Sequence, residues 1–113
     1  MAADRKRVAF VYQGSLLAEG VRSLLAASDL RAVAIQLDDE GAEERLRALS
    51  PDVVIVDADD EAFRSTPPTA LLERMPDVSL VCLHGGGDHV DVYRKRRVPL
   101  GGSRDLAAAI GAA

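Results

Sequence analysis

The feature that most constrains the fold is the segment PDVVIVDADD, residues 51–60, in which four β-branched residues stand in a row. An uninterrupted apolar run such as Val53 to Val56 is typical of a strand buried on both faces, in the middle of a parallel sheet. Asp57 follows at the carboxyl end of this strand. Because ligands and chemistry gather at the carboxyl ends of the strands in open α/β sheets, Asp57 marks the place where a site is expected.

Short apolar runs alternate with amphipathic stretches along the whole chain, which predicts βα units on a parallel sheet. Strands are expected at 7–12, 31–37, 52–57 and 78–83, with a short fifth strand at 98–100. The expected helices begin at an N-cap on Ser15 and end near 28–29, cover 41–49, run from 67–68 to Pro76, occupy a short stretch from about 88, and cover 103–111. Helical spacing predicts that their inward residues are Leu17, Val21, Leu24, Leu25, Ala42, Leu46, Leu49, Leu71, Leu72, Met75, Leu106, Ala109 and Ile110.

Length and composition limit the class of protein. The chain has 113 residues, 48% of them hydrophobic and 28% charged, which suits one folded domain covering 1–113. The formal net charge of −4 gives no general attraction to nucleic acid or to an anionic membrane. No apolar run is long enough to span a bilayer, the polar start MAADRKR lacks the apolar core of a signal peptide, and the single Cys82 suits a reducing compartment. We therefore expect a cytoplasmic protein without a membrane partner, and a buried packing role for Cys82.

Three stretches resemble one protein family. RVAFVYQGSLLAEGVRSLL is similar to the first strand and helix of the receiver domains of bacterial two-component response regulators, particularly those attached to helix-turn-helix output domains. PDVVIVD is similar to the segment that carries their phosphoacceptor aspartate, and DLAAAI resembles the start of their final helix. The resemblance implies a flavodoxin-like (βα)5 fold with a parallel five-stranded sheet in the order 2-1-3-4-5. The weak pattern after residue 84 implies that helix four and strand five are reduced.

The resemblance also implies a phosphorylation site from which most parts are missing. The family uses an acidic pair after strand one to bind Mg²⁺, an aspartate after strand three, a hydroxyl after strand four and a lysine after strand five. In this sequence these positions fall on Tyr12 and Gln13, Asp57, His84, and on or near Gly101. Because Mg²⁺ is bound chiefly through carboxylate oxygens and water, Tyr12 and Gln13 are poor replacements. We therefore expect Asp57 to be a hydrogen-bonded carboxylate in a degenerate pocket, with Asp59 and Asp60 in solvent.

The histidines allow two further interpretations. His84 and His89, with Asp57 and Asp88, have donor types that suit zinc, but their spacing is not that of a closed structural site, so we expect no metal. His84 beside Asp57 would instead form an ion pair or a pH-sensitive hydrogen bond. The glycines at 85–87 lack the lysine and Ser/Thr of a phosphate-binding loop, and no catalytic motif is present, so we expect neither an enzyme nor a cofactor.

A basic run, Arg94, Lys95, Arg96 and Arg97, follows Tyr93. The run could contact phosphates, but four adjacent residues cannot share one face of a helix and the domain is acidic, so we expect a protein-contact surface.

The sequence hypothesis is an atypical receiver-like signalling module that acts through protein contacts or dimerisation without aspartyl phosphorylation. It would act alone or as the regulatory part of a transcription regulator. Three alternatives stay open: a small-molecule sensor that uses the degenerate pocket, a phosphoacceptor at Asp57 with an unusual Mg²⁺ arrangement, and nucleic-acid contact through 94–97.

Overall fold

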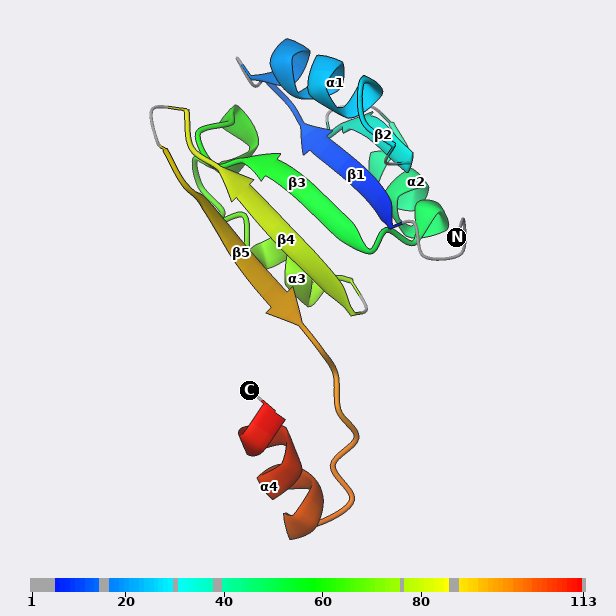
Figure 1. Cartoon of the computed structure of the whole chain (residues 1–113), viewed down its shortest axis with the longest axis vertical. Coiled ribbons are helices and arrows are strands. Elements are labelled where there is room, and N and C mark those ends of the chain that lie inside the picture. The colour runs from blue at the N-terminus through cyan, green and yellow to red at the C-terminus, as the bar shows by residue number, and fades with distance from the viewer. Residues whose placement is uncertain are drawn as a thin grey trace.

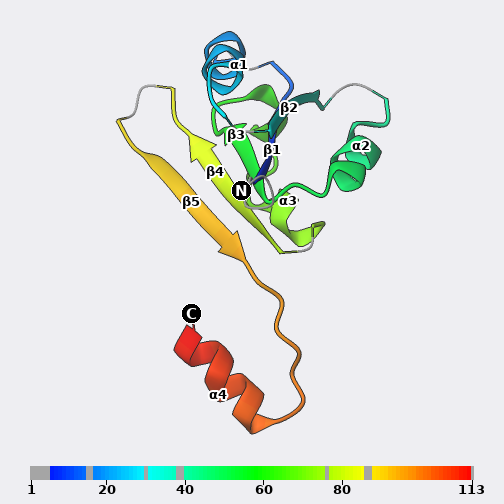
Figure 2. The same ribbon diagram turned by 45° about the vertical axis from the view of Figure 1, so that its right-hand side comes forward.

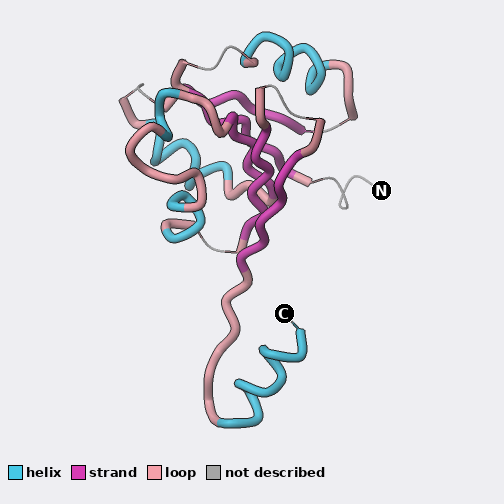
Figure 3. Tube along the Cα trace, turned by 90° about the vertical axis from the view of Figure 1, so that its left-hand side faces the viewer, coloured by secondary structure: helices cyan, strands magenta, loops and turns pink. Residues whose placement is uncertain are grey.

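The computed structural model describes residues 6–14, 17–29, 31–37, 40–75, 77–85 and 88–112. These residues form an α/β fold with helices on both sides of a five-stranded mixed sheet, whose order is β2-β1-β3-β4-β5 (Figures 1 and 3). The strands are β1 Arg7–Tyr12, β2 Arg31–Gln36, β3 Val53–Asp57, β4 Val78–Leu83 and β5 Val90–Lys95. The helices are α1 Ala18–Ala26, α2 Ala42–Leu49, the 3-10 helix η2 Glu61–Phe63, α3 Ala70–Glu73 and α4 Ser103–Ala112.

The first four strands confirm the predicted elements and the predicted strand order. β1 pairs in parallel with β2 and β3, and β3 pairs in parallel with β4. The side chains of Val54, Val56, Leu80 and Cys82 belong to one buried core on the sheet face that α2 and α3 cover, together with Ala42, Leu46 and Met75. The apolar run that predicted a central strand is therefore buried as expected.

The fifth strand differs from the prediction in place and in direction. Residues 90–95 form β5, which pairs antiparallel with β4, whereas residues 98–100 are in no strand and the expected helix from about 88 is absent from this segment. The physical reason is the short connection, residues 84–89, because a parallel crossover needs roughly a dozen residues or more. The sheet is therefore mixed rather than all parallel.

The predicted inward residues of α2 are confirmed, and those of α1 are confirmed in part. In α2, Ala42 and Leu46 are buried and Leu49 packs on the core, as predicted. In α1, Leu25 is buried, but Leu24 is 72% exposed, against expectation. The predicted N-cap Ser15 and the predicted helix end Pro76 lie outside the described residues.

The last helix, α4, lies apart from the sheet at the end of an extended segment, residues 96–102 (Figures 1 and 2). Leu106 and Ile110, predicted to face inward, are 51% and 67% exposed. The radius of gyration of 15.5 Å exceeds the value of about 13 Å for a compact domain of roughly this length. The apolar side of α4 thus has no cover within the described chain.

Part of the sheet face that α1 covers is left uncovered by the described helices. Opposite residues in a sheet point to the same face, and the register aligns Ile55 with Val81 and Val81 with Val92. Leu83 with Val90 continues this apolar surface. On the same face Phe10 is fully buried, in the strand that runs under α1, whereas Val90 and Val92 are half exposed. We call Ile55, Val81, Leu83, Val90 and Val92 the uncovered sheet face.

None of the described helices is long and apolar enough to cross a bilayer.

Candidate functional site

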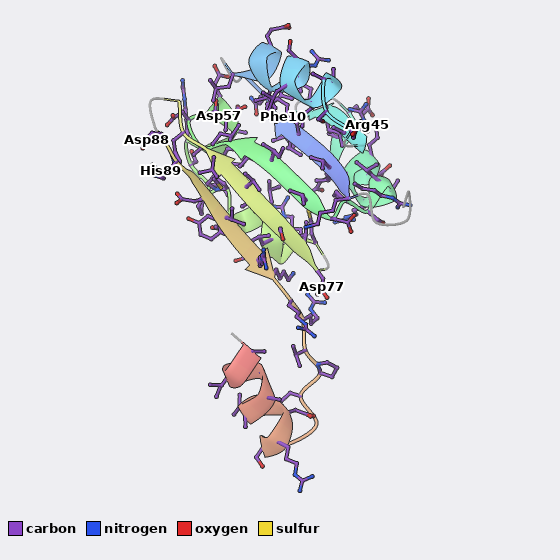
Figure 4. The ribbon with its side chains drawn as sticks, viewed as in Figure 1. Phe10, Arg45, Asp57, Asp77, Asp88 and His89 are labelled. Carbon is purple, nitrogen blue, oxygen red and sulfur yellow. The ribbon has the colours of Figure 1, made fainter. Side chains whose placement is uncertain are left out.

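Asp57 lies at the end of β3, as the sequence predicted, and is buried (Figure 4). Its Oδ1 accepts a hydrogen bond of 3.0 Å from the backbone N–H of Asp59. Asp59 is exposed, and its Oδ2 accepts a 3.1 Å hydrogen bond from the N–H of Gly85 at the end of β4. Both carboxylates therefore help to shape the loops at the carboxyl ends of the strands.

Asp60 is buried, which corrects the expectation that it is solvated. Its carboxylate is 2% exposed and accepts hydrogen bonds from the N–H groups of Gln13 at 2.9 Å, Gly14 at 3.0 Å and Ala62 at 3.1 Å. The contact with Ala62 caps η2, and the other two fix the loop after β1. Asp60 therefore connects two loops at the site, through the backbone of Gln13 and Gly14 after β1 and of Ala62 after β3.

A cavity of about 520 Å³ opens at these strand ends and is lined by Gly14, Leu17, Asp57, Asp59, Glu61, Arg64 and Gly85. The Glu61 side chain lies against Gly14, where an added Cβ would be 3.1 Å from Glu61 Cδ. Sequence reasoning missed Glu61 and Arg64, because neither belongs to a recognisable motif. The cavity is strongly charged: of its three carboxylates, Asp57 ends β3, and Asp59 and Glu61 belong to the loop and the 3-10 helix that follow.

The other residues of the predicted pocket do not line this cavity. The Tyr12 ring stacks on Phe10 with centroids 5.2 Å apart, and the Arg22 guanidinium lies 5.8 Å from the centroid of the Tyr12 ring. Gln13 contributes its backbone N–H to Asp60. Gly101 lies between β5 and α4, away from the strand ends, and its N–H donates to Asp105. The structure therefore does not bring Gly101 to Asp57.

His84 lies just after β4, and its Nε2 is 2.8 Å from Asp91 Oδ2 on β5. The His89 ring lies beside it, with ring centroids 5.4 Å apart, and Asp88 Oδ1 is 3.4 Å from His89 Nδ1. Figure 4 shows Asp88 and His89 together at the start of β5. Sequence reasoning considered Asp57 as the partner of His84 and missed Asp91, because the antiparallel hairpin was not foreseen.

Cys82 is buried in the core, as predicted. Burial raises the pKa of the Cys82 thiol, and the negative charge of Asp91 raises this pKa further. The thiol is therefore held in its unreactive, protonated form.

The basic run is divided between different environments. Lys95 Nζ donates to the carbonyl oxygens of Leu72 and Met75 at the end of α3, and the N–H of Arg97 donates to Asp77 at 2.8 Å. Arg94 points to the opposite face from Lys95, because side chains alternate along a strand. Tyr93 is 41% exposed. Lys95 therefore does not share one patch with Arg94.

A groove of about 750 Å³ separates α1 from the β4–β5 connection. It is lined by Leu17, Gly20, Val21, Leu24, Leu83, His84, Asp88, His89 and Val90. The apolar side of α1 and the end of the uncovered sheet face thus meet in one depression.

Comparison of the chain with protein-family models, with curated proteins and with solved structures gives no match.

Proposed function

We propose that this chain is a receiver-like signalling module that acts through protein contact, and that its partner is a second copy of the same chain. The sequence resemblance supports the first part, together with the parallel order β2-β1-β3-β4 and the position of Asp57 at the end of β3. A flavodoxin-like ancestry with an altered fifth strand accounts for these features.

The arrangement of the acidic residues supports signalling without phosphorylation. Mg²⁺ needs several converging oxygen ligands, and Asp60 is turned to three backbone N–H groups. Within the described residues, the carboxylates that line the strand-end cavity form no cluster of three converging donors. The lysine position of the family falls on or near Gly101, which lies in the segment between β5 and α4.

The observation that carries the proposed contact is a pair of unpartnered apolar surfaces on one chain. The first is the uncovered sheet face with the adjoining groove, where Leu24 is 72% exposed. The second is the side of α4 that carries Leu106, Ala109 and Ile110, which are spaced i, i+3 and i+4. Burying each exposed apolar side chain is favourable by roughly 1–3 kcal/mol, so surfaces of this kind tend to acquire a partner.

A second copy fits because it would cover both surfaces at once. Residues 96–102 carry α4 away from its own sheet, and in a two-fold dimer each α4 would pack on the uncovered sheet face of the other chain. Exchange of a terminal element between identical chains needs no new complementary surface. β5 is an edge strand of the sheet, and the backbone groups on its outer edge are open to pairing with a strand of another chain.

The test is the mass in solution by light scattering after size-exclusion chromatography. We expect the unaltered chain to be a dimer, and Leu106→Asp and Val92→Asp each to weaken dimerisation by at least about tenfold. Both residues are more than half exposed, so these variants should keep the fold. Ala108→Asp is the matched control, because Ala108 lies on the opposite side of α4, and it should remain a dimer. A monomeric unaltered chain, or a dimer unaffected by both substitutions, would contradict the proposal.

A further inference from the structure

The β4–β5 hairpin brings together three side chains that can bind a metal ion. The donor atoms of His84, His89 and Asp91 all lie within 4.8 Å of one another. No other such group of three His, Cys, Asp or Glu side chains occurs within the part of the chain that the structure describes.

The strand register explains why these three residues meet. Cys82 pairs with Asp91 and Leu83 with Val90, so continuing the same register places His84 opposite His89. Alternation along the strands then puts His84, His89 and Asp91 on one face. Asp91 therefore lies on the hydrogen-bonded ladder of β4 and β5, and His84 and His89 lie one residue beyond the last pair of that ladder, Leu83 and Val90.

We propose that His84, His89 and Asp91 form a binding site for a divalent transition-metal ion of the Zn²⁺ type. Two imidazoles and one carboxylate are a known ligand set for Zn²⁺, and the fourth tetrahedral position would be open to water or another ligand. At metal–ligand bonds of about 2.0 Å, tetrahedral ligand atoms are about 3.3 Å apart. The 2.8 Å separation of His84 Nε2 and Asp91 Oδ2 needs only a small change to reach this spacing.

The surroundings of the three residues also suit a cation. Asp88 approaches His89 Nδ1, which would orient the ring and leave Nε2 for the metal. Among the residues that line the adjoining groove, none is Lys or Arg. The side chains of His84 and Asp91 are 33% and 46% exposed, so an ion can reach them from solvent. The hydrogen bond from Gly85 N–H to Asp59 fixes the start of the β4–β5 connection. Mg²⁺ prefers oxygen ligands and should bind poorly.

The test is calorimetric titration of the full chain with Zn²⁺, using protein prepared without a histidine tag, and with Mg²⁺ in a parallel experiment. We expect one Zn²⁺ per chain, no measurable Mg²⁺ binding, and a rise in the unfolding temperature with Zn²⁺. His89→Gln and Asp91→Asn should each weaken Zn²⁺ binding by more than about tenfold.

Asp29→Asn is the control for the loss of one negative charge, and it should bind Zn²⁺ like the unaltered chain. His89 is exposed, so His89→Gln should fold normally, and circular dichroism checks this. The proposal is wrong if Zn²⁺ does not bind, or if it binds with the same affinity to His89→Gln and Asp91→Asn. The mass in solution is measured without added metal, so the proposed dimer and the proposed Zn²⁺ site are tested independently.

Discussion

Asp60 illustrates how a single buried carboxylate organises the strand-end loops. Its carboxylate accepts hydrogen bonds from three backbone N–H groups. Two of them, from Gln13 and Gly14, follow β1, and the third, from Ala62, follows β3. Asp60 is almost fully buried. A charged acceptor buried at this depth is tolerated because those donors compensate for its lost hydration. The loop after β1 therefore depends on Asp60 for its conformation.

We expect Asp60→Ala to lower the free energy of unfolding by about 1.5–3 kcal/mol, because three N–H groups lose a charged acceptor. Asp59→Ala should cost about 1 kcal/mol or less, since Asp59 is exposed and accepts one hydrogen bond, from Gly85. Urea unfolding followed by circular dichroism measures both. Equal losses for the two variants would show that Asp60 has no special structural role.

Cys82 provides a chemical probe of the core. The raised pKa reduces the thiolate fraction at neutral and mildly alkaline pH, and burial blocks access of a reagent. We expect iodoacetamide to modify Cys82 at least about tenfold more slowly in the native chain than in urea, as followed by mass spectrometry. Comparable rates in the two conditions would mean that β4 is not packed in the core.

Sequence reasoning located Asp57 and Cys82 and missed the roles of Asp60 and Asp91. A run of β-branched residues identifies the strand on which Asp57 stands, and the apolar stretch around Cys82 assigns this residue a packing role in the core. The hydrogen bonds of Asp60 depend on how two loops approach each other, and no local spacing encodes this. The contact between Asp91 and His84 depends on the direction of β5.

At the scale of the elements, the segment that forms β5 has a sequence pattern that does not identify it clearly as a strand. Val90, Val92 and Tyr93 are residue types that favour strands, yet the glycines before them and the charges after them obscured the pattern. The pattern of apolar runs placed a short fifth strand further on, at 98–100, and the resemblance to receivers implied that the fifth strand is parallel. The short connection excludes a crossover, so the segment pairs as a hairpin with β4.

The antiparallel register predicts which engineered cysteines can join. Val81 and Val92 are directly opposite, so Val81→Cys with Val92→Cys, in a Cys82→Ser background, should form a disulfide within one chain on oxidation. The closed loop should then raise the free energy of unfolding by up to roughly 3 kcal/mol.

Val81→Cys with Tyr93→Cys is the matched control, because Tyr93 points to the other face of the sheet, and it should stay reduced. Non-reducing electrophoresis separates a bond within one chain from one between chains. Oxidation of the control pair alone would mean that the register is shifted by one residue.

At the scale of the whole molecule, periodicity established that α4 has an apolar side and did not establish what covers it. Leu106, Ala109 and Ile110 are the residues of the helix at 103–111 that helical spacing predicts to face inward. Because β5 runs antiparallel, the chain leaves the sheet at the end opposite to Asp57, and α4 starts from there (Figure 1). Leu24 on α1 and Val90 and Val92 on β5 are also exposed.

The separation of α4 from the sheet gives the molecule a measurable shape. Leu106→Asp, at a concentration where its weakened dimer has dissociated, should give a radius of gyration near 15.5 Å by small-angle X-ray scattering, because its α4 stays apart from the sheet. The unaltered chain and the control Ala108→Asp should give the mass of two chains. If the unaltered chain were instead a monomer with a radius near about 13 Å, α4 would pack on its own sheet. That result would reject exchange between two copies and assign the same apolar surfaces to closure within one chain.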